Sequence, residues 1–452
     1  MPDIRSFSTI GKLCGALVAV LSLTACQLPF LPKDQQTPTT QPSARLEGPC
    51  VVLALSSKVP MSARVKRGAQ LASRELAVDR INVRIEHIDT DLPDWLTKLN
   101  ALPESCAVVG GPMRNDAYRS AKNAGALEKR AFFGFLNNLE QGDEGVRAWR
   151  FFASPQDQID ALVAFADSID IATFGAFYPN DAYGQRMTAL MAQTLAKRHV
   201  TLHRASYPPA SNTGWTEAAA TLVKPMQGAQ GTGSMAVPTP NTPFEALFVP
   251  APWKQMGMIT TSFAYNGEDR LVLMGTTAWE QALAGRQVPN AEKFALAVFP
   301  AAWNSANPPK ALVGQANDMW TSLGYDFVNF AVNMGLYKRL PANEVTARAI
   351  RSAMHVRALA PLHYDSQGHA HQQLFLYGVS SAGMVPMDVN AFRQARTAVL
   401  ERSALRQQGL TPEGEPVPTT PVMGQPAQPG AVPTTLPTTS YKLRLPSAPA
   451  RQ

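Results

Sequence analysis

The stretch Ile171–Pro209, IATFGAFYPNDAYGQRMTALMAQTLAKRHVTLHRASYPP, decides the fold because it predicts one complete β-α-β unit. Its first part, Ile171–Tyr178, is a continuous apolar run of strand length, as found in strands buried on both faces of a parallel sheet. Asp181 is placed to cap the following helix. Val200–Tyr207 then predicts the returning strand, reached by a right-handed crossover.

The helix between these strands has one apolar face and a basic end. Positive charge at Lys197, Arg198 and His199 complements the carbonyl end of the helix dipole. The apolar face consists of Met187, Leu190, Met191 and Leu195.

The same alternation of strand and helix continues on both sides of this unit and predicts an α/β fold with parallel sheets. A long helical stretch is expected at Lys310–Gly335, and a hairpin at Leu359–Met387 with Asp365–Gly368 as its turn. The other expected strands are Cys50–Ser56, Val83–Ile88, Cys106–Gly110, Ala131–Phe135, Phe244–Val249, Arg270–Gly275 and Lys293–Pro300.

Composition indicates a globular protein with two or three cores. The chain has 452 residues, of which 45% are hydrophobic and 17% charged, with a formal net charge of +7. Lysine and arginine are scattered singly, without basic runs or aromatic-basic interleaving, so no nucleic-acid partner is expected.

The N-terminus resembles a bacterial lipoprotein signal. Arg5 and Lys12 precede a short apolar core, Cys14–Leu23, and the segment Leu23-Thr24-Ala25-Cys26 is similar to a lipobox. The resemblance implies a signal peptide at 1–25, cleavage before Cys26 and acylation of that residue. An ordinary secretory signal with an incidental cysteine is the alternative. Acyl chains would anchor the protein in the cell envelope, in the outer or the inner membrane.

Two segments are too rich in Pro, Thr and Gln to form a core: a tether at 26–47 and a tail at 405–452. Outside the signal and the lipobox only Cys50 and Cys106 remain, each at the start of an expected strand. If the second strand along the chain lies beside the first and the third lies on its other side, the strands that begin at Cys50 and Cys106 are neighbours. This arrangement favours a disulfide, and two buried free thiols are the alternative.

Three motifs occur in a characteristic order: strand, loop and helix at Val51–Leu71, then Val109-Gly110-Gly111-Pro112, then YPNDAYGQ at Tyr178–Gln185. With this order the chain resembles, over about 48–387, the type I periplasmic binding proteins, in particular the leucine/isoleucine/valine-binding group. Gly275-Thr276 after a strand adds to this resemblance. It implies two lobes, each a mostly parallel sheet flanked by helices, with lobe 1 at 48–152 and 301–354 and lobe 2 at 153–300 and 355–393.

Carried over by position, the resemblance gives six candidate ligand-binding residues. The family has a small hydroxyl residue after Gly-Pro to hold a ligand carboxylate, and here Arg114 and Asn115 stand in that loop. Asn137 lies where the family has a Ser/Ala/Thr cluster, and Trp253 where it has a second-lobe Tyr. Tyr183 matches an aromatic that lies against the ligand, and Glu280 is the candidate partner of its ammonium group. The alternatives are an exposed loop Arg114 and a Tyr183 packed on its own helix.

A related group consists of lipoproteins that activate penicillin-binding proteins. Its members have the same two-lobe domain, and the Gly-rich insertion at Gln227–Thr242 is similar to one of theirs. Two functions therefore remain: binding of an amino acid or short peptide for delivery to an ABC permease, or regulation of peptidoglycan synthesis through contact with a penicillin-binding protein.

Enzyme chemistry is not expected. The sequence has no nucleophile elbow and no phosphate-binding loop, and no cofactor is predicted. His363, His369 and His371 cluster near the expected hairpin turn, but an exposed hairpin is favoured over a metal site.

Overall fold

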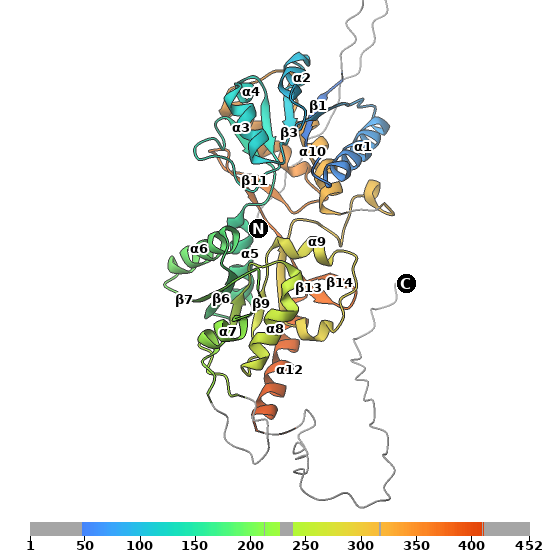
Figure 1. Ribbon diagram of the computed structural model, residues 1–452. Coiled ribbons are helices and arrows are strands. Elements are labelled where there is room, and N and C mark those ends of the chain that lie inside the picture. The colour runs from blue at the N-terminus through green and yellow to red at the C-terminus, as the bar shows by residue number, and fades with distance from the viewer. Residues whose placement is uncertain (1–47, 212, 227–237, 316–317, 409, 411–452) are drawn as a thin grey trace, which may run out of the picture. The chain divides into compact units, whose positions relative to one another are not determined.

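The computed structural model describes residues 48–211, 213–226, 238–315, 318–408 and 410, and these residues form two α/β lobes, each with its own sheet (Figure 1). The predicted signal peptide, Cys26, the tether, residues 227–237 of the Gly-rich insertion and the tail beyond Leu410 lie outside the described residues. The α/β class with mostly parallel sheets is confirmed.

The sheet of lobe 1 is parallel throughout, with strand order β2-β1-β3-β4-β5. Side chains of β1 alternate between two cores, one on each face of the sheet. The elements are β1 (Cys50–Leu55), α1 (Ser62–Val78), β2 (Arg84–Asp89), α2 (Trp95–Ala101), β3 (Val108–Gly110), α3 (Asn115–Asn123), α4 (Ala126–Lys129), β4 (Ala131–Gly134) and β5 (Ala148–Arg150).

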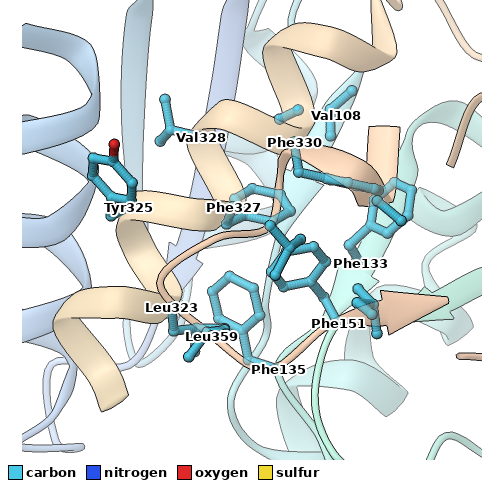
Figure 2. Close-up of a cluster of buried hydrophobic side chains, with 14 of the residues drawn as sticks. Val108, Phe133, Phe135, Phe151, Leu323, Tyr325, Phe327, Val328, Phe330 and Leu359 are labelled. Atoms are coloured by element: carbon cyan, nitrogen blue, oxygen red, sulfur yellow. The ribbon is translucent and has the colours of Figure 1, made fainter. Parts of the chain in front are cut away.

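Two later helices, α10 (Met319–Met334) and α11 (Ala342–Ser352), complete lobe 1. The backbones of α1 and α10 approach closely because each has a glycine at the contact. A Cβ atom on Gly68 would lie 1.8 Å from the Thr321 carbonyl oxygen, and one on Gly324 would lie 1.9 Å from that of Val65. Beneath α10, aromatic rings fill the core (Figure 2), with Phe330 4.9 Å from both Phe133 and Phe151 between ring centroids.

The sheet of lobe 2 has the order β14-β13-β10-β9-β8-β6-β7. β13 pairs antiparallel with β10, and β14 pairs antiparallel with β13. The predicted β-α-β unit is present as β6, α6 and β7, and Asp181 caps α6 through a 2.8 Å hydrogen bond from the Gly184 amide. The elements are α5 (Pro155–Ser168), β6 (Phe174–Pro179), α6 (Ala182–Ala196), β7 (Leu202–Tyr207), α7 (Trp215–Val223), β8 (Ala246–Phe248), α8 (Met256–Tyr265), β9 (Val272–Met274), α9 (Glu280–Leu283), β10 (Ala297–Ala301), β13 (Phe375–Ser380), β14 (Gly383–Pro386) and α12 (Val389–Gln407).

The expected single hairpin at Leu359–Met387 is wrong, because the structure has two hairpins there. β11 (Leu362–Tyr364) and β12 (Ala370–Gln372) form a separate two-stranded sheet, and β13 and β14 join the sheet of lobe 2. Leu359, Leu362, Tyr364 and Leu374 pack in the core of lobe 1. The chain therefore enters lobe 2 after about residue 374, and the predicted boundary at 355 is too early.

The sequence-based description of two helices also needs correction. Within the expected helix Lys310–Gly335 only Met319–Met334 is α-helical, with a short 3-10 turn at Lys310–Leu312. The helix α12 was not predicted at all. It continues to Gln407, beyond the expected start of the tail at 405, because Arg406 forms two ion-pair contacts of 2.6 and 2.7 Å with Asp269.

A disulfide joins Cys50 to Cys106, with an S–S distance of 2.06 Å. Cys50 opens β1, and Cys106 lies just before β3, the strand next to β1 in the sheet. The bridge therefore links the amino ends of two neighbouring parallel strands.

None of the helices in the described residues combines the length and the apolar composition that a bilayer span requires.

Candidate functional site

All six candidate residues follow the carboxyl ends of parallel strands, where ligands bind in open α/β sheets. In lobe 1, Arg114 and Asn115 follow β3 and Asn137 follows β4. In lobe 2, Tyr183 follows β6, Trp253 follows β8 and Glu280 follows β9. The topology therefore places three candidates at the corresponding edge of each sheet.

Arg114 is held by carboxylates of its own lobe. Its guanidinium donates to Asp116 through Nε at 3.0 Å and through Nη2, and Nη1 lies 3.4 Å from Asp91. The hydrogen bond to Asp116 raises the pKa of Arg114 and lowers that of Asp116. Asn115 and Asn137 are exposed at the same edge. A ligand carboxylate would have to compete with Asp116 and Asp91 for Arg114.

Asp91 and Asp89 organise the loop after β1. Asp91 accepts hydrogen bonds from the hydroxyls of Ser56 at 2.7 Å and Ser57 at 3.2 Å, and from the amide of Lys58 at 2.9 Å. The bond from Ser56 is the main reason why the pKa of Asp91 lies below its ordinary value. Asp89 also accepts a hydrogen bond from the Ser57 amide at 3.1 Å, so the two aspartates stabilise a loop that begins more than 30 residues earlier in the chain.

Tyr183 lies on the first turn of α6 and packs against its own lobe. Its hydroxyl donates to Oγ1 of Thr276 at 3.0 Å, and burial raises its pKa. Thr276 is fully buried directly after β9. The Tyr183 hydroxyl is thus satisfied within lobe 2.

Trp253 packs against a second tryptophan. Its ring centroid lies 5.2 Å from that of Trp279 and 4.7 Å from that of Phe294, so it forms part of an aromatic cluster. Trp279 in turn donates from Nε1 to the Ala251 carbonyl oxygen at 2.8 Å. The cluster fixes the start of α9, where Glu280 lies.

Glu280 is the candidate with an incomplete set of partners. Glu280 is only 3% exposed, and its Oε1 has no hydrogen-bond partner within the described residues. Burial raises its pKa to about 8; the amide of Ala302 donates to the carboxyl group and opposes this shift, and the charge of Asp318 adds to it. Asp318 caps α10 in lobe 1, so Glu280 of lobe 2 lies near the point where the lobes meet.

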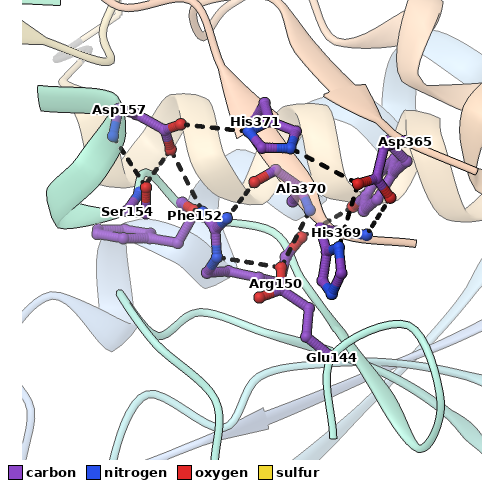
Figure 3. Close-up of polar contacts among 10 residues, drawn as sticks. Glu144, Arg150, Phe152, Ser154, Asp157, Asp365, His369, Ala370 and His371 are labelled. Atoms are coloured by element: carbon purple, nitrogen blue, oxygen red, sulfur yellow. Dashed lines mark hydrogen bonds and ion pairs between the residues drawn. The ribbon is translucent and has the colours of Figure 1, made fainter. Parts of the chain in front are cut away.

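A buried arginine occupies the first crossing between the lobes (Figure 3). Arg150 lies at the end of β5 and is within 3.2 Å of Glu144 and 3.4 Å of Asp157. It also donates to the carbonyl oxygens of Phe152 and Ala370. Asp157 belongs to α5 of lobe 2 and forms a capping box with Ser154. No local pattern indicates this network, because Ala370 is 220 residues away from Arg150 in the chain.

A second anchor holds the returning chain. Asp326 in α10 is fully buried and accepts hydrogen bonds of 2.7 to 3.1 Å from the amides of Arg357, Ala358 and Leu359. Burial nevertheless raises its pKa to about 7. The carboxylate thereby fixes the segment that leads from α11 toward β11.

The three histidines lie on the β11–β12 hairpin. His363 and His371 are opposite each other in register, and Nδ1 of His369 lies 3.1 Å from Asp365. His371 is 62% exposed, with ring nitrogens 3.9 Å from Asp157 and from Asp365 (Figure 3). In the described part of the chain no group of three His, Cys, Asp or Glu residues is arranged to hold a metal.

Comparisons with known proteins find similarity in structure only. No protein-family model matches the sequence, and no curated protein matches it either. A putative branched-chain amino acid ABC transporter from Rhodospirillum rubrum has 10% identity and a TM-score of 0.56, covering 75% of this chain and 100% of that one. An ABC transporter substrate-binding protein from Desulfitobacterium hafniense has 13% identity and a TM-score of 0.54, with coverages of 75% and 99%.

A further structural relative is full-length LpoA from Haemophilus influenzae, with 11% identity and a TM-score of 0.51. The match covers 75% of this chain but only 59% of LpoA. Such low identities establish the fold alone. The chain therefore has the two-lobed fold of the type I periplasmic binding proteins.

Proposed function

We propose that this chain is a non-enzymatic, lipid-anchored binding protein of the cell envelope whose lobes close on a small polar ligand with an ammonium group, such as an amino acid or short peptide. The observation that carries the proposal is Glu280, a buried carboxyl group of lobe 2 near the junction with lobe 1, whose Oε1 has no hydrogen-bond partner among the described residues. An ammonium group supplies both the charge and the hydrogen-bond donors that this oxygen lacks.

The charges on the facing edge of lobe 1 agree with a cationic ligand group. Arg114 is already neutralised by Asp116 and Asp91, and Asp89 stands nearby. Closing would be a population shift, in which contacts from both lobes stabilise the closed form, which an ABC permease then recognises.

Calorimetric titration of the full chain with single amino acids and short peptides tests the proposal. Glu280 is largely neutral at pH 6.5 because its pKa is about 8. Pairing with an ammonium group stabilises the carboxylate, so binding should release up to one proton. Titrations in buffers of different ionisation enthalpy measure this release. Glu280→Gln should abolish it and weaken binding about tenfold.

Glu292→Gln is the matched control, because it removes an exposed carboxylate from the same lobe. It should change neither the proton release nor the affinity for the ligand. If no amino acid or peptide in the panel binds, or if Glu280→Gln binds and releases protons like the wild type, the proposal fails.

The second candidate is a regulator of peptidoglycan synthesis that contacts a penicillin-binding protein. It is favoured by Arg114 and Tyr183, whose polar groups pair within their own lobes, and by Trp253, which packs in an aromatic cluster. Titration of the full chain with a purified penicillin-binding protein, in the absence of small ligands, tests this candidate; saturable binding supports it.

Anchoring through Cys26 is part of the proposal and has its own test. Mass spectrometry of the membrane fraction should find an acylated N-terminal Cys26, whereas Cys26→Ser should yield an unmodified chain. Detection of unmodified wild-type N-termini would contradict the anchor.

A further inference from the structure

Lobe 2 contains a cavity at the edge of its sheet where the parallel strands begin, opposite to the edge that carries the candidate site. The cavity is lined by α8, by α12 and by Leu271 and Leu296, which directly precede β9 and β10. β9 and β10 are parallel, so these residues mark the amino ends of the strands. The residues proposed to bind the polar ligand follow the carboxyl ends.

The cavity has the size and the interior of a small-molecule site. Its volume is about 490 Å³, within the range of roughly 300–1,000 Å³ that ligand pockets occupy. Its apolar lining comes from Ile259, Phe263, Leu271, Leu273, Leu296 and Val399. Five of these six side chains are buried in lobe 2, and Val399 of α12 is half-buried.

The wall formed by α12 is held in place by ion pairs in the middle of the helix and at its C-terminal end. Arg406 pairs with Asp269 at 2.6 and 2.7 Å, and Arg396 is paired with Glu245. The cavity is therefore closed by an element that is fixed to the rest of lobe 2.

The charges around the cavity leave cations available. Glu268 is paired with Arg270 at 2.7 Å and Asp269 with Arg406, so two of the three acidic residues in the lining are already neutralised. The lining also contains Lys293 and Arg402. Among the described residues neither is paired with a carboxylate, and Arg402 donates only to the Ala398 carbonyl oxygen of its own helix, at 3.3 Å.

The third acidic residue, Glu292, is exposed next to Lys293 in the chain. Two unpaired cations against one unpaired carboxylate leave the rim with a net positive charge. We propose that this cavity binds an amphipathic anion: an aliphatic or aromatic body lies on the apolar lining, and its carboxylate contacts Lys293 and Arg402. This second site is independent of the ligand proposed for the carboxyl ends of the strands.

Titration of the full chain with decanoate below its micelle concentration tests the proposal, with decanol and decyltrimethylammonium as comparators of equal chain length. Decanoate should bind saturably with one site. Decanol should bind about tenfold more weakly, because it lacks the charge, and the cation should bind more weakly still. Equal binding of all three would mean non-specific apolar adsorption and would overturn the proposal.

Two kinds of variant locate the site. Lys293→Gln with Arg402→Gln should weaken decanoate binding about tenfold while leaving decanol unchanged. The matched control, Arg119→Gln with Lys129→Gln, removes two exposed cations from lobe 1 and should have no effect.

Filling the cavity should abolish binding of decanoate. Ala295 and Ala264 line the cavity and are themselves exposed, so Ala295→Trp and Ala264→Trp each add volume there without entering a packed core. Ala124→Trp in lobe 1 is the control. Unfolding temperatures identify any variant that fails to fold. If one filling variant does not fold, decanoate binding is measured on the other. Unchanged affinity in a folded filling variant would refute the site.

Discussion

The buried carboxyl group of Glu280 makes the free energy of unfolding depend on pH. Its ordinary pKa is 4.5, and the folded protein raises it to about 8. Between these values the folded state holds a proton that the unfolded state has lost, so Glu280 lowers stability as the pH rises through this window.

We predict that Glu280→Gln becomes progressively more stable than the wild type between pH 4.5 and 8. Glutamine fills the same space without the cost of an ionisable group, and the difference should grow by several kcal/mol, at about 1.4 kcal/mol for each pKa unit. Urea unfolding at pH 5, 6.5 and 8 measures it. Glu292→Gln serves as the exposed control; a difference for Glu280→Gln that stays constant with pH would contradict the prediction.

Sequence placed the candidate residues at the ends of strands but could not assign their partners. The position of Tyr183 on the first turn of α6 follows from the local pattern around Asp181, which the structure confirms as the cap. Its partner Thr276 lies 93 residues away, and no periodicity contains that information. Likewise, the neutralisation of Arg114 by Asp91 depends on the pairing of distant strands.

At the scale of elements, the disulfide links two strands of one sheet across a long loop. Cys50 and Cys106 are 56 residues apart. We predict that Cys50→Ala with Cys106→Ala loses about 4 kcal/mol of unfolding free energy, because the unfolded chain regains the entropy of that loop. Denaturant unfolding measures the loss.

Reducing agent provides the control for the disulfide. It should destabilise the wild type by a similar amount and leave the double variant unchanged. A wild type insensitive to full reduction would contradict a stabilising role of this bridge.

Asp326 offers a second prediction at this scale, because one side chain of α10 holds three consecutive backbone amides. Asp326→Ala leaves the amides of Arg357, Ala358 and Leu359 without this acceptor, and we expect a loss of about 2–4 kcal/mol. Hydrogen exchange should accelerate at these three amides. Asn329→Ala removes a side-chain hydrogen bond within the same helix and should cost less than about 1 kcal/mol.

Local patterns identified the helices with a buried apolar face but missed α12. The apolar face of α6 was visible because Met187, Met191 and Leu195 recur at helical spacing. By contrast, α12 fully buries only Phe392 of its apolar side chains, with Val389, Ala395 and Val399 partly buried, and the acidic residues that Arg396 and Arg406 contact are more than 130 positions earlier. Patterns among residues that are close in the sequence do not predict charge pairs over such separations.

At the scale of the whole molecule, the fold depends on how the chain passes between two sheets. The alternation of strands and helices predicted both lobes, yet the boundary at 355 was wrong. The β11–β12 hairpin contributes Leu362 and Tyr364 to the core of lobe 1, although its residues lead directly into β13 of lobe 2. Membership of a lobe is decided by which core buries the apolar side chains, and sequence order alone does not give this.

Arg150 connects these crossings, and its removal should therefore affect both lobes. It contacts Glu144 of lobe 1, Asp157 of lobe 2 and the Ala370 carbonyl oxygen of the hairpin. We predict that Arg150→Met costs about 3–5 kcal/mol, because it leaves two carboxylates without their buried cation. Urea unfolding measures this loss.

Hydrogen exchange gives the readout specific to the junction. In Arg150→Met, exchange should accelerate both in the strand Ala370–Gln372 and at the first turn of Pro155–Ser168, since Asp157 loses its partner on one side and Ala370 on the other. Arg147→Met removes a half-exposed arginine paired with Asp143 and should leave both segments protected. Accelerated exchange on only one side of the junction would mean that Arg150 stabilises a single lobe and does not couple the two.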